Sequence, residues 1–420
     1  MTGLISFVRR RPGGTSPGIG PARRPATVAL LGADYPGLHP AFAVTEGERV
    51  RRGEVLFTDA RRPRIAFVSP VDGVVASLAR GPRRVLSSVV LTCDPLLREE
   101  RSAAPIAGTD AADPRPTLLE RGLWPAFLSR PFGRIPDPEA RPEAIFVNAV
   151  EPGPGATDPR AILALRPDDF ERGLDILMAL TEGPVFVCQP PGPDLARPGR
   201  DRLRTACFRN GYPTGLAGHH IARLHPPGPA GSVWSIGVQD VIAIGHLFNT
   251  GHYLGDRIVT LSRAGPPGTE VFPTLLGAKL RDIAAPSGAE RPEAMRLLSG
   301  AQSFGRESAF LRRYHSLVSV APAPNRREPA SWLARLGRTG HAFRKTPIIP
   351  VAALDRALPT DAPAVPLMRA LSIGDVETAE RLGVLDLIEE DVALLTRTCT
   401  SGSDYGQLLR QVLDELESAA

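Results

Sequence analysis

The sequence is short of lysine, cysteine and aromatic residues, and each shortage excludes a class of function. Only two of its 50 basic residues are lysines, Lys279 and Lys345, so a site that needs a side-chain amine can form only at these two positions. The four cysteines stand singly, without a CxxC pair or any metal-ligand spacing, which excludes a thiolate metal motif. Aromatic residues make up 5 % and the net charge is +5, so we expect no nucleic-acid surface.

Long hydrophobic runs are also missing. No uninterrupted apolar run reaches the ~18 residues that a membrane-crossing helix needs. The most apolar stretch, VWSIGVQDVIAIGHLF from Val233, contains Gln239 and Asp240. The N-terminus, MTGLISFVRRRPGG, places its charges after its apolar residues and has no cleavage site, unlike a secretory signal. We expect a cytoplasmic chain that reaches a membrane only through a partner protein.

Residues 1–95 have the pattern of a cofactor-carrying domain. The stretch VTEGERVRRGEVLFTDARRPRIAFVSPVDGVVASL (44–78) consists of short strands separated by glycine turns, and apolar runs at 26–32 and 87–93 complete an all-β unit. Biotinyl and lipoyl domains, which are barrel-sandwich hybrids, look like this. We therefore predict a barrel-sandwich hybrid here.

The lysine that would carry the cofactor is absent from this unit. Between Leu56 and Pro70 the basic residues are all arginines: Arg61, Arg62 and Arg64. A guanidinium stays protonated and is a poor nucleophile, so it cannot replace lysine as an acylation site. The sequence predicts the shape of a carrier without its chemistry.

The rest of the chain predicts an α/β multidomain protein. After a polar linker at 96–116, short apolar runs at 143–150 and 183–190 flank an amphipathic helix closed by Gly183, which indicates a βαβ unit in a Rossmann-like domain over 117–255. A helix capped by Thr117 opens that domain. Residues 256–320 predict a β-grasp domain of the SLBB-like type. Residues 330–420 predict a mostly helical region, in which Glu-Glu-Asp (389–391) caps a short helix.

Two glycine-containing loops invite a ligand-binding interpretation. VNAVEPGPGATDP (147–159) follows a predicted strand, but Pro152 and Pro154 remove backbone N–H groups that a phosphate cradle would use, so we favour a structural loop. RNGYPTGLAGHHIARL (209–224) brings Gly215 and Gly218 beside the pair His219 and His220. Neighbouring histidines point in different directions and nothing completes a ligand set, so we predict no metal site.

The second loop resembles the GFPTGLKW end of the flavin-binding loop in the flavin-carrying subunit of respiratory complex I. The glycine-rich front of that loop is missing, since Arg204 to Arg209 stand where glycines would contact the flavin phosphate. The resemblance implies an inherited loop that no longer binds flavin. No nucleophile, catalytic triad or carboxylate pair is evident, and we predict no catalytic residue.

The whole chain resembles the A subunit of the sodium-translocating NADH:quinone reductase. The resemblance rests on blocks that include VALLGADYPGLHPAFAVTEGERVRRGEVLF (28–57), LSRPFGRIPDPEARPEAIFVNAVEPGPGATDP (128–159), GLAGHHIARL (215–224), VWSIGVQDVIAIGHLFNTG (233–251) and LIEEDVALLTRTC (387–399). A related family carries CxxCxxCxxxC iron–sulphur motifs, which this chain lacks. The chain departs from the family pattern in residues 1–20, 281–300 and the tail after Thr398.

The resemblance implies a peripheral subunit on the cytoplasmic side of the bacterial inner membrane. The complex uses NADH, flavins, iron–sulphur centres and ubiquinone to export sodium, whereas this subunit would hold no cofactor. Its partners would be the five subunits B to F, one of them a membrane subunit on which it docks, with ubiquinone as a further ligand. The quinone-proximal candidates are Tyr212, as a stacking ring, the histidines His219 and His220, as donors to a carbonyl, and the flanking Gly215 and Gly218.

Three alternatives stay open at this point. The loop at 209–224 could simply pack the core or a domain contact. The chain could be a self-standing flavoprotein that uses this loop. It could also be a carrier-like adaptor that presents its β-unit to a transferase, although the missing lysine argues against that.

Overall fold

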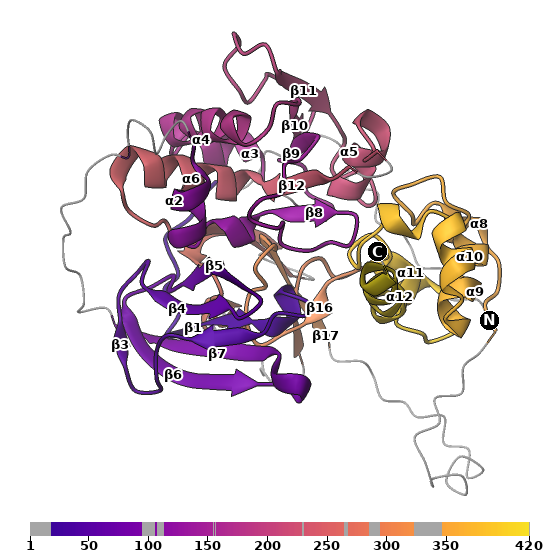
Figure 1. Cartoon of the computed structure of the whole chain (residues 1–420), viewed down its shortest axis with the longest axis horizontal. Helices are drawn as coiled ribbons and strands as arrows, with labels where there is room; N and C mark the ends of the chain where they lie inside the picture. Colours follow the sequence, from indigo (N-terminus) through magenta and orange to yellow (C-terminus); the bar gives the residue numbers. More distant parts are fainter. Residues whose placement is uncertain are drawn as a thin grey trace, which may run out of the picture.

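The computed structural model describes residues 18–94, 106, 113–153, 155, 157–228, 231–263, 268–284, 295–322 and 347–419. Its elements fall into four groups that follow one another along the chain (Figure 1). A β-unit comes first, a sheet with helices on both faces follows, a second mixed sheet comes third, and a cluster of helices ends the chain. The predicted linker at 96–116 lies mostly outside the described residues.

The first group contains two small sheets that face each other. A four-stranded sheet has the order β1-β7-β6-β3 and a three-stranded sheet the order β2-β4-β5, with all neighbours antiparallel. Within the three-stranded sheet, the rings of the paired residues Phe57 and Phe67 stack with centroids 4.6 Å apart. The elements are β1 (Thr27–Leu31), η1 (Gly32–Asp34), β2 (Pro40–Phe42), β3 (Arg49–Val50), β4 (Val55–Asp59), β5 (Arg62–Val68), β6 (Gly73–Arg80), η2 (Pro82–Arg84) and β7 (Leu86–Cys93).

The turn between β4 and β5 is where a carrier would present its lysine. Here Arg62 donates through Nε to Asp59 Oδ2 at 3.0 Å and through Nη1 to the carbonyl oxygen of Ile135 at 2.8 Å. The side chain nearest the carrier position therefore holds the β-unit against the second group.

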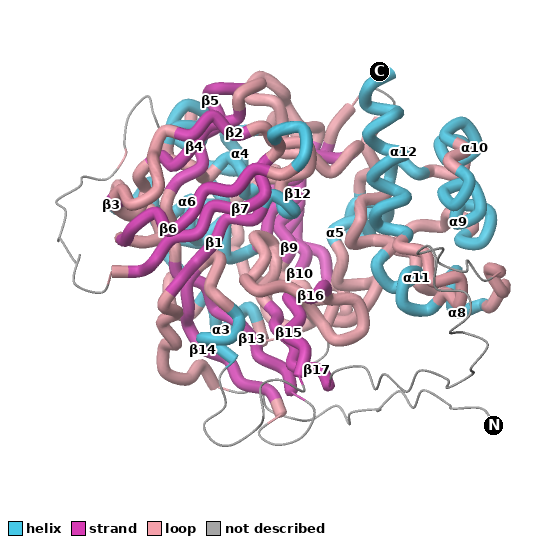
Figure 2. Tube along the Cα trace, turned by 90° about the horizontal axis from the view of Figure 1, so that it is seen from below, coloured by secondary structure: helices cyan, strands magenta, loops and turns pink. Residues whose placement is uncertain are grey.

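The second group is a five-stranded sheet in the order β11-β10-β9-β12-β8. The first four strands run parallel and β8 is antiparallel at one edge. Helices α4 and α6 cover one face and α5 the other (Figures 1 and 2). The elements are α2 (Arg115–Glu120), η3 (Trp124–Ala126), β8 (Leu128–Arg130), β9 (Ala144–Asn148), α3 (Pro159–Leu163), α4 (Pro167–Leu180), β10 (Val185–Gln189), β11 (Leu203–Cys207), α5 (Ala217–Leu224), β12 (Val233–Gly237) and α6 (Val238–Thr250).

Small residues let α4 and α6 cross closely. A Cβ added at Gly173 would lie 2.2 Å from the carbonyl oxygen of Val241, and one at Gly245 would lie 1.7 Å from that of Asp169.

Two predicted helix boundaries are wrong in detail. Helix α2 begins at Arg115 after Pro114, so Thr117 lies inside its first turn rather than capping it. Helix α4 ends at Leu180, and Thr181 is already extended.

The third group is a five-stranded mixed sheet in the order β14-β13-β17-β15-β16. The central pair β13 and β17 is parallel and the other neighbours are antiparallel. Helix α7 packs Leu280 and Ile283 against this sheet in one core cluster. The elements are β13 (Asp256–Arg263), β14 (Thr269–Leu275), α7 (Leu280–Ala284), β15 (Met295–Ser299), β16 (Arg306–Glu307) and β17 (Leu317–Pro322).

The last group is helical and has a hydrophobic core of its own, with Leu367, Leu395 and Leu409 fully buried in it. The part of the predicted helical region before residue 347 lies outside the described residues. The Glu-Glu-Asp stretch does not cap a helix: α11 has Val392 as its N-cap, with no side-chain cap bond. The elements are α8 (Ala352–Asp355), α9 (Ala364–Ile373), α10 (Val376–Arg381), η6 (Val384–Asp386), α11 (Ala393–Thr398) and α12 (Tyr405–Ala419).

Candidate functional site

A cavity of about 280 Å³ opens at the carboxyl ends of β9 and β12, which terminate at Asn148 and Gly237. These neighbouring parallel strands mark the point where the sheet order reverses, because the chain leaves β9 toward β10 and returns on the other side as β12. Crevices at such a point are where open α/β sheets bind ligands. We call this space the junction cavity.

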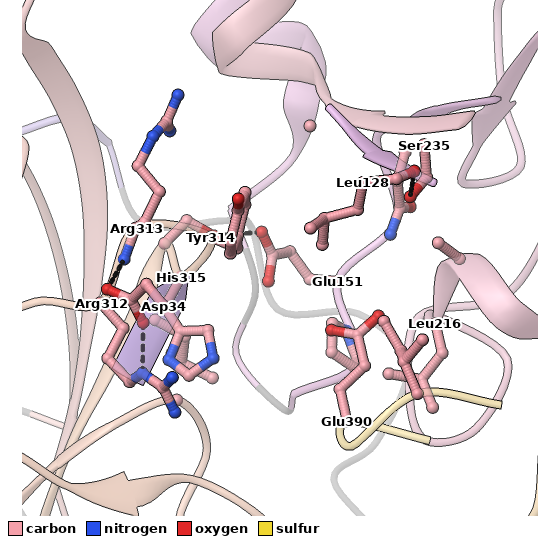
Figure 3. A pocket seen from close by; sticks show the side chains of 18 of the residues that line it. Asp34, Leu128, Glu151, Leu216, Ser235, Arg312, Arg313, Tyr314, His315 and Glu390 are labelled. Carbon is pink, nitrogen blue, oxygen red and sulfur yellow. Dashed lines mark hydrogen bonds and ion pairs between the residues drawn. The ribbon is translucent and has the colours of Figure 1, made fainter. Parts of the chain in front are cut away.

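All four groups contribute to the wall of the junction cavity (Figure 3). Leu128 and Leu216 give it an apolar side, and Phe304 adds an aromatic ring. The charged and polar wall comes from segments far apart in the sequence: Asp34 after β1, Glu151 after β9, Asp240 in α6, Arg312, Arg313, Tyr314, His315 and Ser316 before β17, and Glu389 and Glu390 before α11.

Buried ion pairs fix the segment before β17. The carboxylate of Asp240 lies 2.5 Å from Arg257 Nη2 and 2.9 Å from Arg313 Nη2. Asp34 accepts from Arg312 Nε at 2.5 Å and from the backbone N–H of Arg313 at 2.9 Å. Charges this deeply buried are tolerated because each has a partner. The pairs therefore hold the third group against α6 and η1.

His315 is held as a neutral hydrogen-bond donor. Ser299 Oγ accepts the backbone N–H of Arg312 at 3.0 Å and lies 2.9 Å from His315 Nδ1. Nε2 of His315 has no partner among the described residues. In the tautomer in which Nδ1 accepts the Ser299 hydroxyl, the ring proton lies on Nε2 and is free to donate. Burial and the neighbouring Arg312 lower the pKa of His315 to about 3.

Two carboxyl groups in the junction cavity ionise less readily than usual. Glu151 accepts a short hydrogen bond from Ser316 Oγ, and burial raises its pKa. Glu390 keeps 41 % of its side-chain surface exposed, because it faces the cavity. The surrounding protein, together with the charge of Asp391, raises the pKa of Glu390 to about 7. Both groups can therefore carry a proton closer to neutral pH than free carboxyls do.

The sequence-based candidates lie around this cavity, and Gly215 alone of the five lines it. A Cβ on Gly215 would lie 2.6 Å from the backbone of Glu151, so this glycine lies against protein and leaves no room for a side chain. Tyr212 donates its hydroxyl to the carbonyl oxygens of Glu390 and Asp391 at 3.0 and 2.7 Å. Its ring packs on Phe304 with centroids 5.0 Å apart.

The remaining candidates make packing contacts. His219 Nδ1 lies 3.1 Å from the carbonyl oxygen of Pro359 in the helical group. His220 is fully buried, lies 2.9 Å through Nε2 from the carbonyl oxygen of Thr214, and has a pKa that burial lowers to about 4. A Cβ on Gly218 would lie 2.5 Å from Asp391 Oδ1. These contacts favour the interpretation that the loop packs a domain contact.

The helical group is attached to the sheet by a buried ion pair. Arg130 at the end of β8 donates through Nη1 to Asp391 Oδ2 at 2.7 Å and to the carbonyl oxygen of Asp386 at 3.0 Å. Both side chains are at most 1 % exposed. Because Asp391 is fixed by Arg130, the next residue in the sequence, Glu390, is held at the wall of the cavity.

Sequence reasoning missed Glu151, His315 and Glu390 as a group. Glu151 lies in the loop at 147–159 and Glu390 in the Glu-Glu-Asp stretch, but neither pattern points to the other segments, and only the fold brings the three residues together. Among the described residues, no group of three His, Cys, Asp or Glu side chains is arranged to hold a metal ion. Within the same ranges, every helix is too short or too polar to cross a membrane.

Comparison with known proteins decides the family. The NqrA N-terminal barrel-sandwich hybrid domain matches residues 12–94, and the NqrA second alpha/beta domain matches residues 110–253. The A subunit of the Na(+)-translocating NADH-quinone reductase of Neisseria meningitidis serogroup A is 36 % identical over 417 residues, which cover 93 % of each chain. The corresponding protein of Pseudomonas aeruginosa is 36 % identical over 424 residues, or 94 % of each chain. The chain belongs to this family.

The resemblance inferred from the sequence is thus confirmed, as are the barrel-sandwich hybrid and the α/β domain that follows it. The family consists of subunits of an oxidoreductase complex, so the partners of this chain include other subunits of that complex. Among solved structures, an NAD+-reducing NiFe hydrogenase in the air-oxidized state aligns with a TM-score of 0.34 and 15 % identity over 66 % of this chain and 55 % of the other. That similarity is too weak to identify a shared fold.

Proposed function

We propose that the chain is the peripheral subunit on the cytoplasmic side of the bacterial inner membrane in a complex that couples NADH oxidation and ubiquinone reduction to sodium export. It contacts subunits B to F and docks on a membrane subunit, and it holds no redox cofactor itself. Similarity over 93 % of its length to relatives named for this complex supports the role.

The strand order supports finer assignments of two domains. The parallel strands of the second group, numbered in chain order, lie as 3-2-1-4, which matches the first four strands of the Rossmann order 3-2-1-4-5-6. The third group has a parallel central pair, antiparallel flanks and one packed helix, and we infer a β-grasp domain of the SLBB-like type.

The stretch that replaces the flavin-phosphate glycines supports the absence of flavin. Residues Leu203–Cys207 form β11, an edge strand paired with β10 alone. Arg204 is exposed there. A regular strand uses its backbone groups in sheet pairing and does not form the concave loop that a phosphate needs. We therefore do not assign the self-standing flavoprotein function.

The junction cavity is where we place the ubiquinone ring. Quinone rings are apolar with two carbonyl acceptors. The cavity offers apolar walls at Leu128 and Leu216, the ring of Phe304 and the Nε2–H donor of His315. Gly215 lies in the wall and Tyr212 stands behind Phe304, so these sequence-based candidates remain quinone-proximal. The single observation that carries the placement is the neutral ring of His315, with Nε2 unpaired, in a cavity at the strand ends that has one apolar side.

Binding of a short-chain ubiquinone analogue to the purified chain tests the placement. We expect His315→Ala to weaken binding about tenfold, because the hydrogen bond to a quinone carbonyl is lost. His219→Ala serves as the matched control, since His219 contacts Pro359 outside the cavity. Equal affinity in wild type and His315→Ala would contradict the placement of the quinone in this cavity.

Two further measurements test the rest of the proposed role. The absorption spectrum of the purified chain should lack flavin bands, and a tagged chain purified from membranes should retain subunits B to F.

A further inference from the structure

The free end of the β-unit carries arginines without acidic partners. The turn between β6 and β7 exposes Arg83 and Arg84, and the turn between β4 and β5 exposes Arg61. In the described part of the chain no carboxylate lies within ion-pair distance of these three exposed side chains, whereas most buried or half-buried arginines have an acidic partner. We call this set the arginine tip.

The two turns lie at the same end of the domain. Ala60 donates its backbone N–H to the carbonyl oxygen of His39 at 2.8 Å. Arg80, beside the other turn, places Nη2 3.4 Å from the carbonyl oxygen of Pro40. Both turns therefore flank residues 39–40. The one carboxylate in the β4–β5 turn, Asp59, is buried and is occupied by Arg62.

The backbone at the tip is unusual. Arg83 and Arg84 both have a left-handed conformation, with φ of 54° and 61°. Glycine or asparagine adopts this conformation at lower cost, so the turn itself does not account for two arginines. Bonds across the turn hold it: Gly81 N–H donates to the carbonyl oxygen of Val85 at 2.8 Å, and Arg84 N–H to that of Gly81 at 3.2 Å. The two guanidinium groups thus start from a fixed backbone.

We propose that the arginine tip is a docking surface for a carboxylate-rich surface of a partner protein in the complex. Guanidinium pairs carboxylates in a bidentate geometry, and a rigid turn that fixes two of them suits a structured acidic partner. A lipid surface fits less well. Three charges attract anionic lipid weakly, and stable anchoring needs a second, apolar signal. The exposed large hydrophobic residues of the described chain, Leu165, Ile349, Val351 and Ile373, all lie in other groups.

The proposal rests on the proposed role as a docked subunit, and the test separates the two. The single variants Arg83→Glu and Arg84→Glu and the double variant Arg83→Glu/Arg84→Glu are compared with Arg49→Glu, a charge reversal on β3 that is matched to each single variant. Arg49 is exposed and pairs across the sheet with Val74, near the start of β6, whereas the arginine tip follows its end. The two sites are therefore roughly 20 Å apart along that strand. Each variant is incubated with membranes that hold the complex stripped of this chain, and binding is measured at rising salt concentration.

We expect the double variant to bind about tenfold more weakly than wild type at low salt, with a smaller loss on adding salt, and Arg49→Glu to bind as wild type does. A photo-crosslinker at position 84 should attach to one partner subunit. Unchanged binding of the double variant, while wild type binds, would overturn the arginine tip and leave the subunit role intact. Failure of wild type to bind would overturn the role itself. Binding of the isolated chain to phosphatidylglycerol vesicles that the double variant loses would replace the acidic partner with lipid.

Discussion

Nη1 of Arg130 lies 2.7 Å from Oδ2 of Asp391, and the two residues are separated by 261 positions in the sequence. One stands on the edge strand of the parallel sheet and the other in the loop that leads to α11. This buried pair links the sheet to the helical group. It also holds Glu390 at the cavity and places the carbonyl oxygens of Glu390 and Asp391 at the hydroxyl of Tyr212.

Breaking the Arg130–Asp391 pair should loosen the helical group. We expect Asp391→Asn to cost about 3 kcal/mol in the free energy that holds this contact, because it removes the nearer carboxylate of the buried Arg130 guanidinium and leaves only Glu390, at 3.9 Å, as its acidic partner. Hydrogen exchange of α11 and α12 measures this cost locally. Arg381→Ala is the control: it removes an exposed pair with Glu377 at 3.7 Å and should change exchange by less than about 0.5 kcal/mol. Equal protection in Asp391→Asn and wild type would show that the pair does not hold the group.

Glu390 should make the protein less stable at alkaline pH. Its folded pKa of about 7 is higher than the ordinary value of 4.5, so its contribution is fully present below pH 4.5 and is lost as the pH rises through 7. The full shift corresponds to about 3 kcal/mol, but the side chain is 41 % exposed and solvent screening reduces this to about 1 kcal/mol. Glu390→Gln should therefore gain stability relative to wild type between pH 5 and pH 8, measured as urea midpoints. A constant difference across that range would contradict the raised pKa.

His220 should weaken the protein on the acid side. Its folded pKa of about 4 is below the ordinary 6.5, so the stability that it contributes is present above pH 6.5 and is lost as the pH falls toward 4. Between pH 6.5 and pH 5 the loss is about 2 kcal/mol. His220→Gln keeps a donor for the Thr214 carbonyl but cannot become charged, so its hydrogen exchange in α5 should depend less on pH. The lowered pKa of His315 also reduces stability at acid pH, but it does so equally in wild type and in His220→Gln. The difference between the two pH profiles therefore reports His220 alone. Parallel pH profiles for α5 would refute a depressed pKa at His220.

Much of the fold could be predicted because its signals are local. VWSIGVQDVIAIGHLFNTG contains a strand, a helix and the left-handed Gly251 that ends it, and the structure has β12 and α6 there. Strand β11 was missed because three of its five residues are exposed and none is buried, so it shows no apolar alternation. Its only support is pairing with β10, which a sequence pattern does not reveal.

The candidate site was harder to predict than the fold. Position 218 must be a glycine because a Cβ there would lie 2.5 Å from Oδ1 of Asp391. Asp391 is 173 positions away, and nothing near Gly218 in the sequence predicts this contact. The loop at 209–224 contains α5, whose histidines bond to carbonyls of Thr214 and Pro359. Glu151, His315 and Glu390 come from three domains, so their approach depends on how those domains pack. At Gly215 and Gly218 the backbone passes close to protein, whereas a Cβ at Gly211 would meet nothing within 4 Å.

The junction cavity takes lining residues from all four groups of the chain, and Glu389 and Glu390 of the helical group form one side of it. That group has a hydrophobic core of its own, so its undocking would open the cavity on this side without unfolding the sheet. The cavity is complete only when the four groups are packed together. Ligand binding at this place would then report domain assembly rather than the folding of any single domain.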